Sequence, residues 1–143
     1  MRTWHKLLLA ALAAVVVAGA AVFVVQEREE ARRAAERESL RSAAESIFQA
    51  RADKKDAVWR QYAAPSGRVW SEARARVTLT RAEKEGTRTR AWLQEVTTPY
   101  TTNRSGTDPR PDTPYAGMYV YVFEPSADGW RFVKDVTRQE LHA

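Results

Sequence analysis

The sequence predicts an α+β protein in which an N-terminal transmembrane helix and a helical stalk precede a small antiparallel sheet of about four strands packed on one or two helices. Three observations lead to this prediction. Residues 7–25 are uncharged and apolar, the chain from residue 26 to about residue 48 is rich in Ala, Glu and Arg without Gly or Pro, and after Gly67 apolar and polar side chains alternate. These patterns are typical of a membrane span, an exposed helix and half-buried strands.

The apolar run has the length of a membrane anchor. Its 19 residues form a helix of about 28 Å, close to the roughly 30 Å hydrocarbon core of a bilayer. Trp4 and Lys6 precede it, where an interfacial aromatic ring and a cation are expected. A cleaved signal peptide is the alternative, because the small residues 18–20 resemble a cleavage site, although its apolar region is typically only about 7–15 residues. We therefore expect an uncleaved anchor.

Two features of the flanks predict opposite orientations for this anchor. More basic side chains follow the run than precede it, where Arg2 and Lys6 lie, and the positive-inside rule alone would place the C-terminal flank in the cytoplasm. The short N-terminal flank and the signal-like layout favour the reverse. We expect a cytoplasmic N-terminus and an extracytoplasmic domain in the cell membrane.

The anchor and its flank cover residues 1–25, a charged stalk covers residues 26–39, and the domain covers residues 40–143. Within the domain, an apolar stripe should dock a helix on the sheet; it comprises Leu40, Ala43, Ala44, Ile47 and Phe48. The charged residues 52–56 are expected to interrupt this helix, and residues 57–64 to form a second short one before Pro65, Ser66 and Gly67 end it.

The strands follow from side-chain alternation. Residues 73–80 alternate apolar and polar, residues 83–86 form a turn with Gly86, and residues 87–98 return as a second strand. Residues 116–124 are apolar on both faces and should be central. A turn then leads into residues 130–137, where Trp130, Phe132 and Val136 should share a face.

The order of helix, short helix and meandering strands ending in residues 128–136 (DGWRFVKDV) resembles the nuclear-transport-factor-like or cystatin-like roll. Membrane-anchored bacterial envelope proteins carry such domains, including components of conjugation and secretion systems. The resemblance covers residues 40–137 and implies a cone-shaped roll in the cell envelope. The paired strands also resemble a region that precedes the catalytic part of some envelope amidases. The chain lacks that part and an obvious third helix, which argues against a hydrolase and a deep ligand cavity.

Composition narrows the classes of partner and cofactor. The net charge is +5, but the 23 basic and 18 acidic side chains are interleaved. Nucleic-acid binding normally requires clustered basic residues, so we expect no nucleic-acid partner. The absence of cysteine excludes disulfides, thiolate metal sites, a cysteine nucleophile and a lipid-anchored cysteine.

Catalysis is not predicted. His5 and His142 lie near the chain ends, although His is the commonest general acid or base. Glu95 and Asp135 are the acids within expected strands, and one buried in an apolar cone would resemble the base of a ketosteroid-isomerase-like enzyme. We expect no enzyme, cofactor or metal, and keep an isomerase- or dehydratase-like activity as an alternative.

We expect the domain to bind another envelope protein, as an accessory subunit of a membrane assembly, with a small-molecule-binding roll as the alternative. The polar loop 101–114 is longer than most hairpin connections, so it is either disordered or a docking element. The aromatic strands offer a second surface. The candidate binding residues are Arg104, Asp108, Arg110, Asp112, Tyr115, Trp92, Tyr119, Tyr121 and Trp130.

The uninterrupted apolar run leads to a prediction about attachment. Because a span of this length is held by the hydrophobic effect and not by charge, the chain should stay in membranes through carbonate and high-salt washes. Mass spectrometry of the washed membranes should recover the N-terminal peptide intact. A mature chain beginning at Ala21 would show instead that the run is a cleaved signal.

Overall fold

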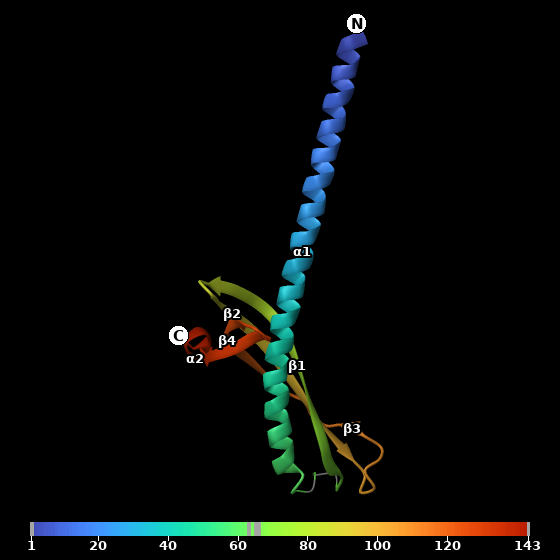
Figure 1. Ribbon diagram of the computed structural model, residues 1–143. Coiled ribbons are helices and arrows are strands. Elements are labelled where there is room, and N and C mark those ends of the chain that lie inside the picture. Colours follow the sequence, from blue (N-terminus) through green and yellow to red (C-terminus); the bar gives the residue numbers. More distant parts are fainter. Residues whose placement is uncertain (1, 63, 65–66, 143) are drawn as a thin grey trace. The chain divides into compact units, whose positions relative to one another are not determined.

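A computed structural model describes residues 2–62, 64 and 67–142. The elements, in chain order, are α1 (Arg2–Trp59), β1 (Val69–Glu85), β2 (Arg88–Thr102), β3 (Arg110–Pro111), β4 (Tyr115–Ser126), β5 (Gly129–Asp135) and α2 (Thr137–Leu141) (Figure 1). The predicted α+β layout, with an apolar N-terminal helix before a small antiparallel sheet, is confirmed. Contacts divide the chain into two compact units, Met1–Glu36 and Arg37–Ala143.

The N-terminal unit is helical throughout its described residues. It contains a window with a mean hydropathy of 2.9, long and apolar enough to cross a membrane. Transmembrane anchors and signal sequences share this property. After the apolar run, Glu29 and Arg33 form an i,i+4 ion pair, at 3.7 Å.

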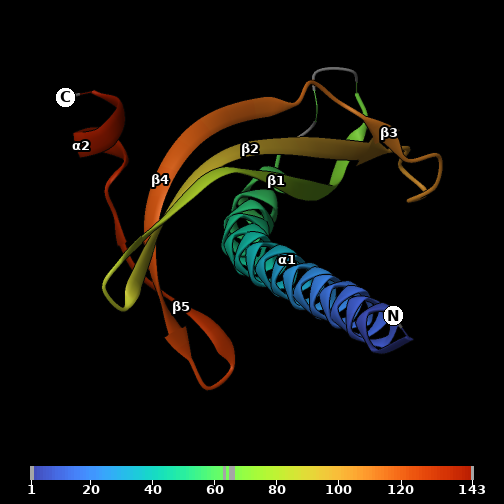
Figure 2. The ribbon, with the colours of Figure 1, turned by 90° about the horizontal axis from the view of Figure 1, so that it is seen from above.

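The second unit contains the sheet. Its strand order is β1-β2-β4-β5, and neighbouring strands are antiparallel. The short strand β3 also pairs with β2, along the part of β2 that follows its pairing with β4. From Tyr121 onward β4 lies between β2 and β5, so the prediction of a central strand is confirmed for that half, whereas its first half pairs with β2 alone. The sheet is curved, and residues 37–59 of α1 lie in its concave face (Figure 2).

The main core forms between α1 and this concave face. Leu40, Ala44, Phe48 and Ala52 recur every four residues along α1, and each is at most 2% exposed. The ring of Phe48 contacts the ring of Tyr121, with centroids 5.4 Å apart. Burying each large apolar side chain stabilises the fold by about 1.5–3 kcal/mol. The expected docking stripe therefore anchors the helix, and its partners on the sheet are Ala75, Val77, Ala91, Leu93, Tyr121 and Phe123.

A smaller core lies on the opposite face of the sheet. There Val120, Val122 and Val136 are buried together, with Trp92 and Val133 packed against them. The prediction that Trp130, Phe132 and Val136 share a face is wrong. β5 carries one extra residue where Val122 pairs with Lys134 but Phe123 pairs with Phe132. Such a bulge reverses the alternation, so Phe132 contacts Tyr121 and Phe123 on the concave face.

The prediction that residues 52–56 interrupt the helix is also wrong, because α1 continues to Trp59. Ala52 is buried, whereas Asp53 is exposed and accepts a hydrogen bond from the Gln49 amide at 2.9 Å. Charged side chains on the exposed side of a helix do not break it; only Gly and Pro carry a large penalty. The second helix expected at residues 57–64 does not form: residues 57–59 are the end of α1, residues 60–62 form a turn and a bend, and Ala63 lies outside the described residues.

β1, β2 and β4 are longer than predicted, whereas β5 ends at Asp135, before the predicted end at residue 137. Glu85 pairs with Arg88, so the turn is formed by Gly86 and Thr87 and not by residues 83–86. Gly86 has φ of +64°, a left-handed conformation that glycine adopts without penalty. The C-terminal helix α2 was not expected; Asp135 accepts hydrogen bonds from the amide and hydroxyl of Thr137 where it begins.

The outer edge of β1 is covered by polar side chains of α1. The Glu45 carboxylate accepts from the Val77 amide at 3.0 Å. The Gln49 side chain donates to the Ala73 carbonyl at 2.8 Å and accepts from the Ala75 amide at 2.9 Å. Further backbone carbonyls accept from arginines: Leu79 from Arg37, Val77 from Arg41 and Ser71 from Arg60. The backbone N–H and C=O groups of an edge strand are normally free to pair with another chain. In this domain they are hydrogen-bonded to side chains of the helix instead.

This ladder leads to a prediction about stability. Gln49→Ala removes two hydrogen bonds from partly buried backbone groups of β1, and should lower the free energy of unfolding by about 1–3 kcal/mol. Ser46→Ala is the matched control, because its hydroxyl bonds only the Ser42 carbonyl within the helix. Denaturant titration of the full chain in detergent micelles measures both. Equal small effects in the two variants would show that the ladder contributes nothing.

Candidate functional site

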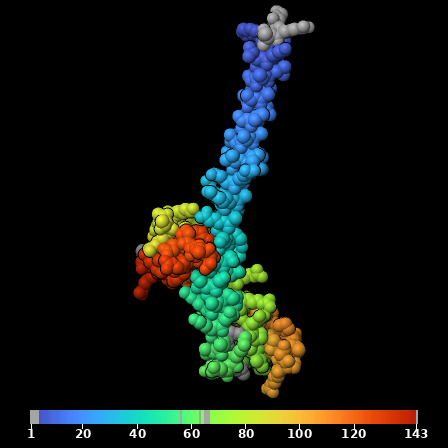
Figure 3. Space-filling model, in the orientation of Figure 1, coloured from blue at the N-terminus to red at the C-terminus, as the bar shows by residue number. Residues whose placement is uncertain are grey.

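An open groove lies at the end of the domain where α1 finishes. It has a volume of about 420 Å³ and a largely apolar lining. In Figure 3 the segment before β4 (orange) lies beside β1 (yellow-green) at this end. The residues lining the groove, called here the distal aromatic groove, are Trp59, Tyr62, Trp70, Pro99, Asp112, Thr113 and Tyr115.

The chain reversal after α1 builds this groove. The Tyr62 amide donates to the Trp59 carbonyl at 2.9 Å, which closes a turn at the helix end. Gly67, at φ of +73°, precedes the return into β1. The reversal brings the rings of Trp59 and Trp70 to 5.3 Å between centroids, and Tyr115 of β4 approaches Trp59 edge-on at 6.4 Å.

The groove has one largely exposed aromatic ring, that of Tyr62, and one cation at its border, that of Lys55. Tyr62 is 65% exposed, so its ring contributes little to the core and is available to a partner. The Lys55 ammonium lies 5.1 Å from the centroid of the Tyr115 ring, within the range of a cation–π interaction. The groove therefore combines aromatic rings with a cation at its border.

The loop before β4 has a defined fold in the structure. Asn103 organises its tip, since its side chain accepts from the Thr107 amide at 2.8 Å and from the Ser105 hydroxyl at 2.7 Å. Arg68 then ties the loop to the sheet, donating to the Thr101 hydroxyl at 3.0 Å and to the Asp108 carbonyl. The sequence left disorder and docking as alternatives for this loop, and the structure describes an ordered loop.

The carboxylate of Asp108 lies between two arginines of the domain. It has a positive φ of 56°, and its carboxylate lies 2.8 Å from the Arg110 guanidinium and 3.5 Å from that of Arg68. The hydrogen bond from Arg110 is the largest cause that lowers the pKa of the Asp108 carboxyl, and Arg68 adds to it. The charged carboxylate is thus part of the folded loop.

The candidate residues from the sequence are dispersed over the domain. Asp112 and Tyr115 line the distal aromatic groove. Arg104 is exposed in the loop turn, and Arg110 lies on β3 beside Asp108. The structure thus brings only the first two together with the groove aromatics.

The remaining aromatic candidates serve packing. Tyr121 is fully buried and belongs to the main core, against which Tyr119 and Trp130 pack. Burial raises the pKa of both tyrosine hydroxyls. Trp92 packs on the opposite face, where the Arg81 guanidinium lies 4.5 Å from its ring.

Three aromatic groove residues were missed as site residues, namely Trp59, Tyr62 and Trp70, as were the lining residues Pro99 and Thr113. Their sequence signal is a pair of tryptophans on either side of a helix stop that contains Pro65 and Gly67. A turn at such a stop returns the chain antiparallel to the helix, so flanking aromatic residues meet.

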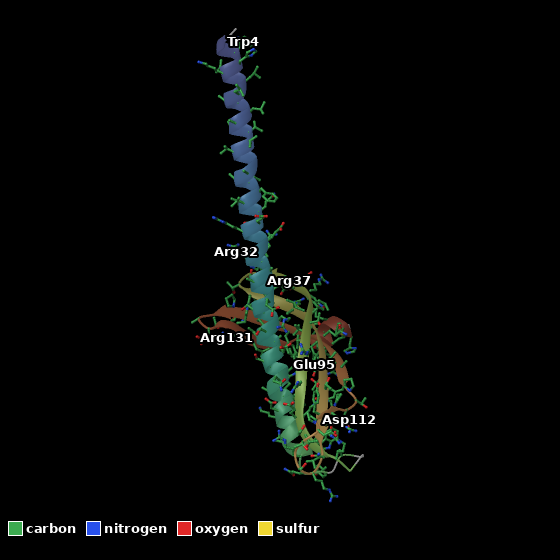
Figure 4. The ribbon with its side chains drawn as sticks, turned by 90° about the vertical axis from the view of Figure 1, so that its right-hand side faces the viewer. Trp4, Arg32, Arg37, Glu95, Asp112 and Arg131 are labelled. Carbon is green, nitrogen blue, oxygen red and sulfur yellow. The ribbon has the colours of Figure 1, made fainter. Side chains whose placement is uncertain are left out.

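Glu95 is the one buried acid among the described residues. It lies midway along the sheet, between Arg37 and Asp112 in Figure 4. Its carboxylate accepts a hydrogen bond from the Thr97 hydroxyl, and it pairs across the sheet with Val77 and Gly117. Within the described chain, no three His, Asp or Glu side chains gather closely enough to hold a metal ion.

Comparison of the chain with models of known protein families, with curated proteins and with solved structures found no match.

The Asp108 cluster leads to a prediction about pH. Because Arg110 favours the charged carboxylate, the stabilisation of the folded loop is present above the unfolded pKa of about 3.9 and is lost as the pH falls through the lower folded value. Arg110→Gln should raise the pKa of Asp108 toward that ordinary value, as measured by NMR titration of its carboxyl carbon. Arg104→Gln, in the same loop, is the control and should leave it unchanged.

Proposed function

We propose that this chain is a non-catalytic, single-pass protein of the bacterial cell membrane whose extracytoplasmic domain binds a partner protein. The anchor in this proposal is the apolar part of α1, which is long and apolar enough to span a bilayer. The binding site in this proposal is the distal aromatic groove.

The composition and exposure of the groove support this proposal. Tryptophan and tyrosine are the residues most enriched where protein partners bind tightly, because they bury a large area at a small entropic cost. Trp59, Tyr62, Trp70 and Tyr115 meet there with Pro99. By contrast, the aromatic rings beneath α1 fill the core, where Phe48 and Tyr121 are at most 2% exposed.

Asp112 and Thr113 add polarity at the groove border, together with Lys55 over Tyr115. Apolar anchors surrounded by polar groups are typical of protein–protein interfaces. A partner that places an apolar side chain between these rings would therefore bury area in the groove and make polar contacts at its border.

A small-molecule-binding roll is the second candidate function, and the burial of Glu95 favours it. This carboxylate is 5% exposed and lies on the concave face, and burying a charge is costly unless it is compensated. Tyr119 lies close enough for the charge of Glu95 to raise the pKa of its hydroxyl, after the larger effect of burial. A ligand with a hydrogen-bond donor could satisfy this acid.

The test is affinity purification of the full chain from gently solubilised membranes, with mass spectrometry of the co-purifying proteins. Tyr62→Ala truncates an exposed groove ring, so it should spare folding and lower the yield of the partner at least tenfold, about 1.4 kcal/mol of binding. Val58→Ala is the matched control, since Val58 is 53% exposed near the end of α1, four residues before Tyr62, and does not line the groove.

Retention of the partner at the wild-type yield by Tyr62→Ala would contradict the groove as the site. In that case, loss of a bound small molecule on Glu95→Gln, detected by native mass spectrometry of the full chain, would favour the second candidate.

A further inference from the structure

The sheet has a second edge, formed by the first half of β4. β5 pairs with β4 only from Tyr121 onward, so Tyr115–Tyr119 have a strand neighbour on the β2 side alone. At Val120 the backbone points away from β2, because its amide donates to the Thr137 hydroxyl at 3.0 Å and its carbonyl accepts from the Val136 amide at 2.9 Å.

Alternation along the strand determines which backbone groups are available. Successive residues of an antiparallel strand direct their N–H and C=O groups to opposite sides. Since those of Val120 point away from β2, those of Ala116 and Met118 do too. No hydrogen bond to these groups occurs among the described residues. They form an unpaired row of two donors and two acceptors.

The two edges of the sheet therefore differ. β1 is covered by the polar ladder of α1, whereas residues 115–119 of β4 (YAGMY) contain no charge and no proline, the usual means by which proteins protect an exposed edge. Met118 is 49% exposed, and beside it on β2 Val96 is 36% exposed on the same face. An apolar patch thus accompanies the unpaired backbone.

We propose that residues 115–119 bind an extended segment of the partner protein as an additional strand beside β4. Main-chain hydrogen bonds to Ala116 and Met118 would supply affinity, and pockets for alternate side chains would supply specificity, as in other complexes formed by strand addition. This inference rests on the proposed partner-binding function and names the mode of binding. Tyr115 borders both this edge and the distal aromatic groove, so one segment can contact both.

The charged side chains beside the edge indicate which side chains the bound segment should have. The nearby acids are already engaged, since the carboxylate of Glu95 accepts from the Thr97 hydroxyl, and those of Asp112 and Asp135 accept from the amides of Thr113 and Thr137. Lys55 lies over Tyr115 on the concave side, and none of the ion pairs between described side chains includes it. The segment should therefore alternate an apolar side chain beside Met118 with an acidic one facing Lys55.

A second copy of this chain fits the edge poorly. A closed dimer through this edge would pair β4 antiparallel with itself. The domain part of α1 runs antiparallel to β1, since Arg37 contacts Leu79 and Arg60 contacts Ser71, and therefore also antiparallel to β4. The two Arg37 residues would then lie at opposite ends of the dimer. This separation disfavours the dimer for two chains that are anchored in the same membrane.

The experiment uses the full chain in lipid nanodiscs and peptides selected on it from a phage-displayed random library. Hydrogen exchange resolved to single amides is measured first without peptide, where the Ala116 and Met118 amides should exchange faster than those of Gly117 and Tyr119. A synthetic form of the most enriched peptide should then slow exchange at Ala116 and Met118 at least tenfold. Enriched peptides should alternate apolar and acidic residues.

Two variants test the edge directly. Met118→Pro removes an outward donor without removing a bond to β2, as proline on an edge strand allows, and should weaken peptide binding at least tenfold. Val96→Thr makes the neighbouring apolar patch more polar but leaves the edge donors in place, and should weaken peptide binding less than Met118→Pro does. Lys55→Glu should weaken binding of the acidic peptides.

Three outcomes would overturn the inference: slow exchange of the Ala116 and Met118 amides in the free chain, no enriched peptide, or peptides that Met118→Pro binds as tightly as the wild type. Peptides that bind independently of β4 but are lost in Tyr62→Ala would overturn strand addition and leave groove binding intact. The exchange measurement on the unaltered chain decides the question even where Met118→Pro fails to fold.

Discussion

The domain depends on the attachment of α1 to the sheet along two adjacent stripes. Leu40, Ala44 and Phe48 fill the concave face, while Glu45 and Gln49 bond the backbone of β1. Apolar burial provides most of the stabilisation but has no direction, whereas hydrogen bonds require particular atoms at particular distances. The apolar stripe therefore holds the helix, and the polar stripe determines its position along the strand. The sheet cannot present the same edges without this helix.

This attachment also explains where a partner can bind. With β1 covered by side chains of α1, strand addition is blocked on that side, and the first half of β4 is left as the exposed edge. The same helix ends at Trp59, so the chain reversal that follows places aromatic rings at one end of the sheet. Groove and edge meet at Tyr115. Both candidate surfaces are thus consequences of where one helix lies and where it stops.

Local patterns anticipated most of the elements and failed where side chains act at a distance. Alternation from Ala73 to Leu79 and from residue 87 onward predicts two strands, and both form because one face of each is buried. The charges at residues 52–56 suggest a break, but Asp53, Lys54 and Lys55 are exposed on α1 and cost the helix little. The bulge on β5 has no signal in composition, because an inserted residue changes only the register.

The sequence by itself determined the class of fold, the apolar N-terminal helix and the docking stripe on α1, because these follow from the period and composition of neighbouring residues. Only the tertiary structure decided which edge of the sheet is covered, which aromatic rings meet at the distal end and which remain in the core. Those outcomes join residues far apart in the chain, such as Gln49 with Ala73 and Trp59 with Tyr115. The contacts between them depend on packing geometry, which no local pattern of side chains specifies.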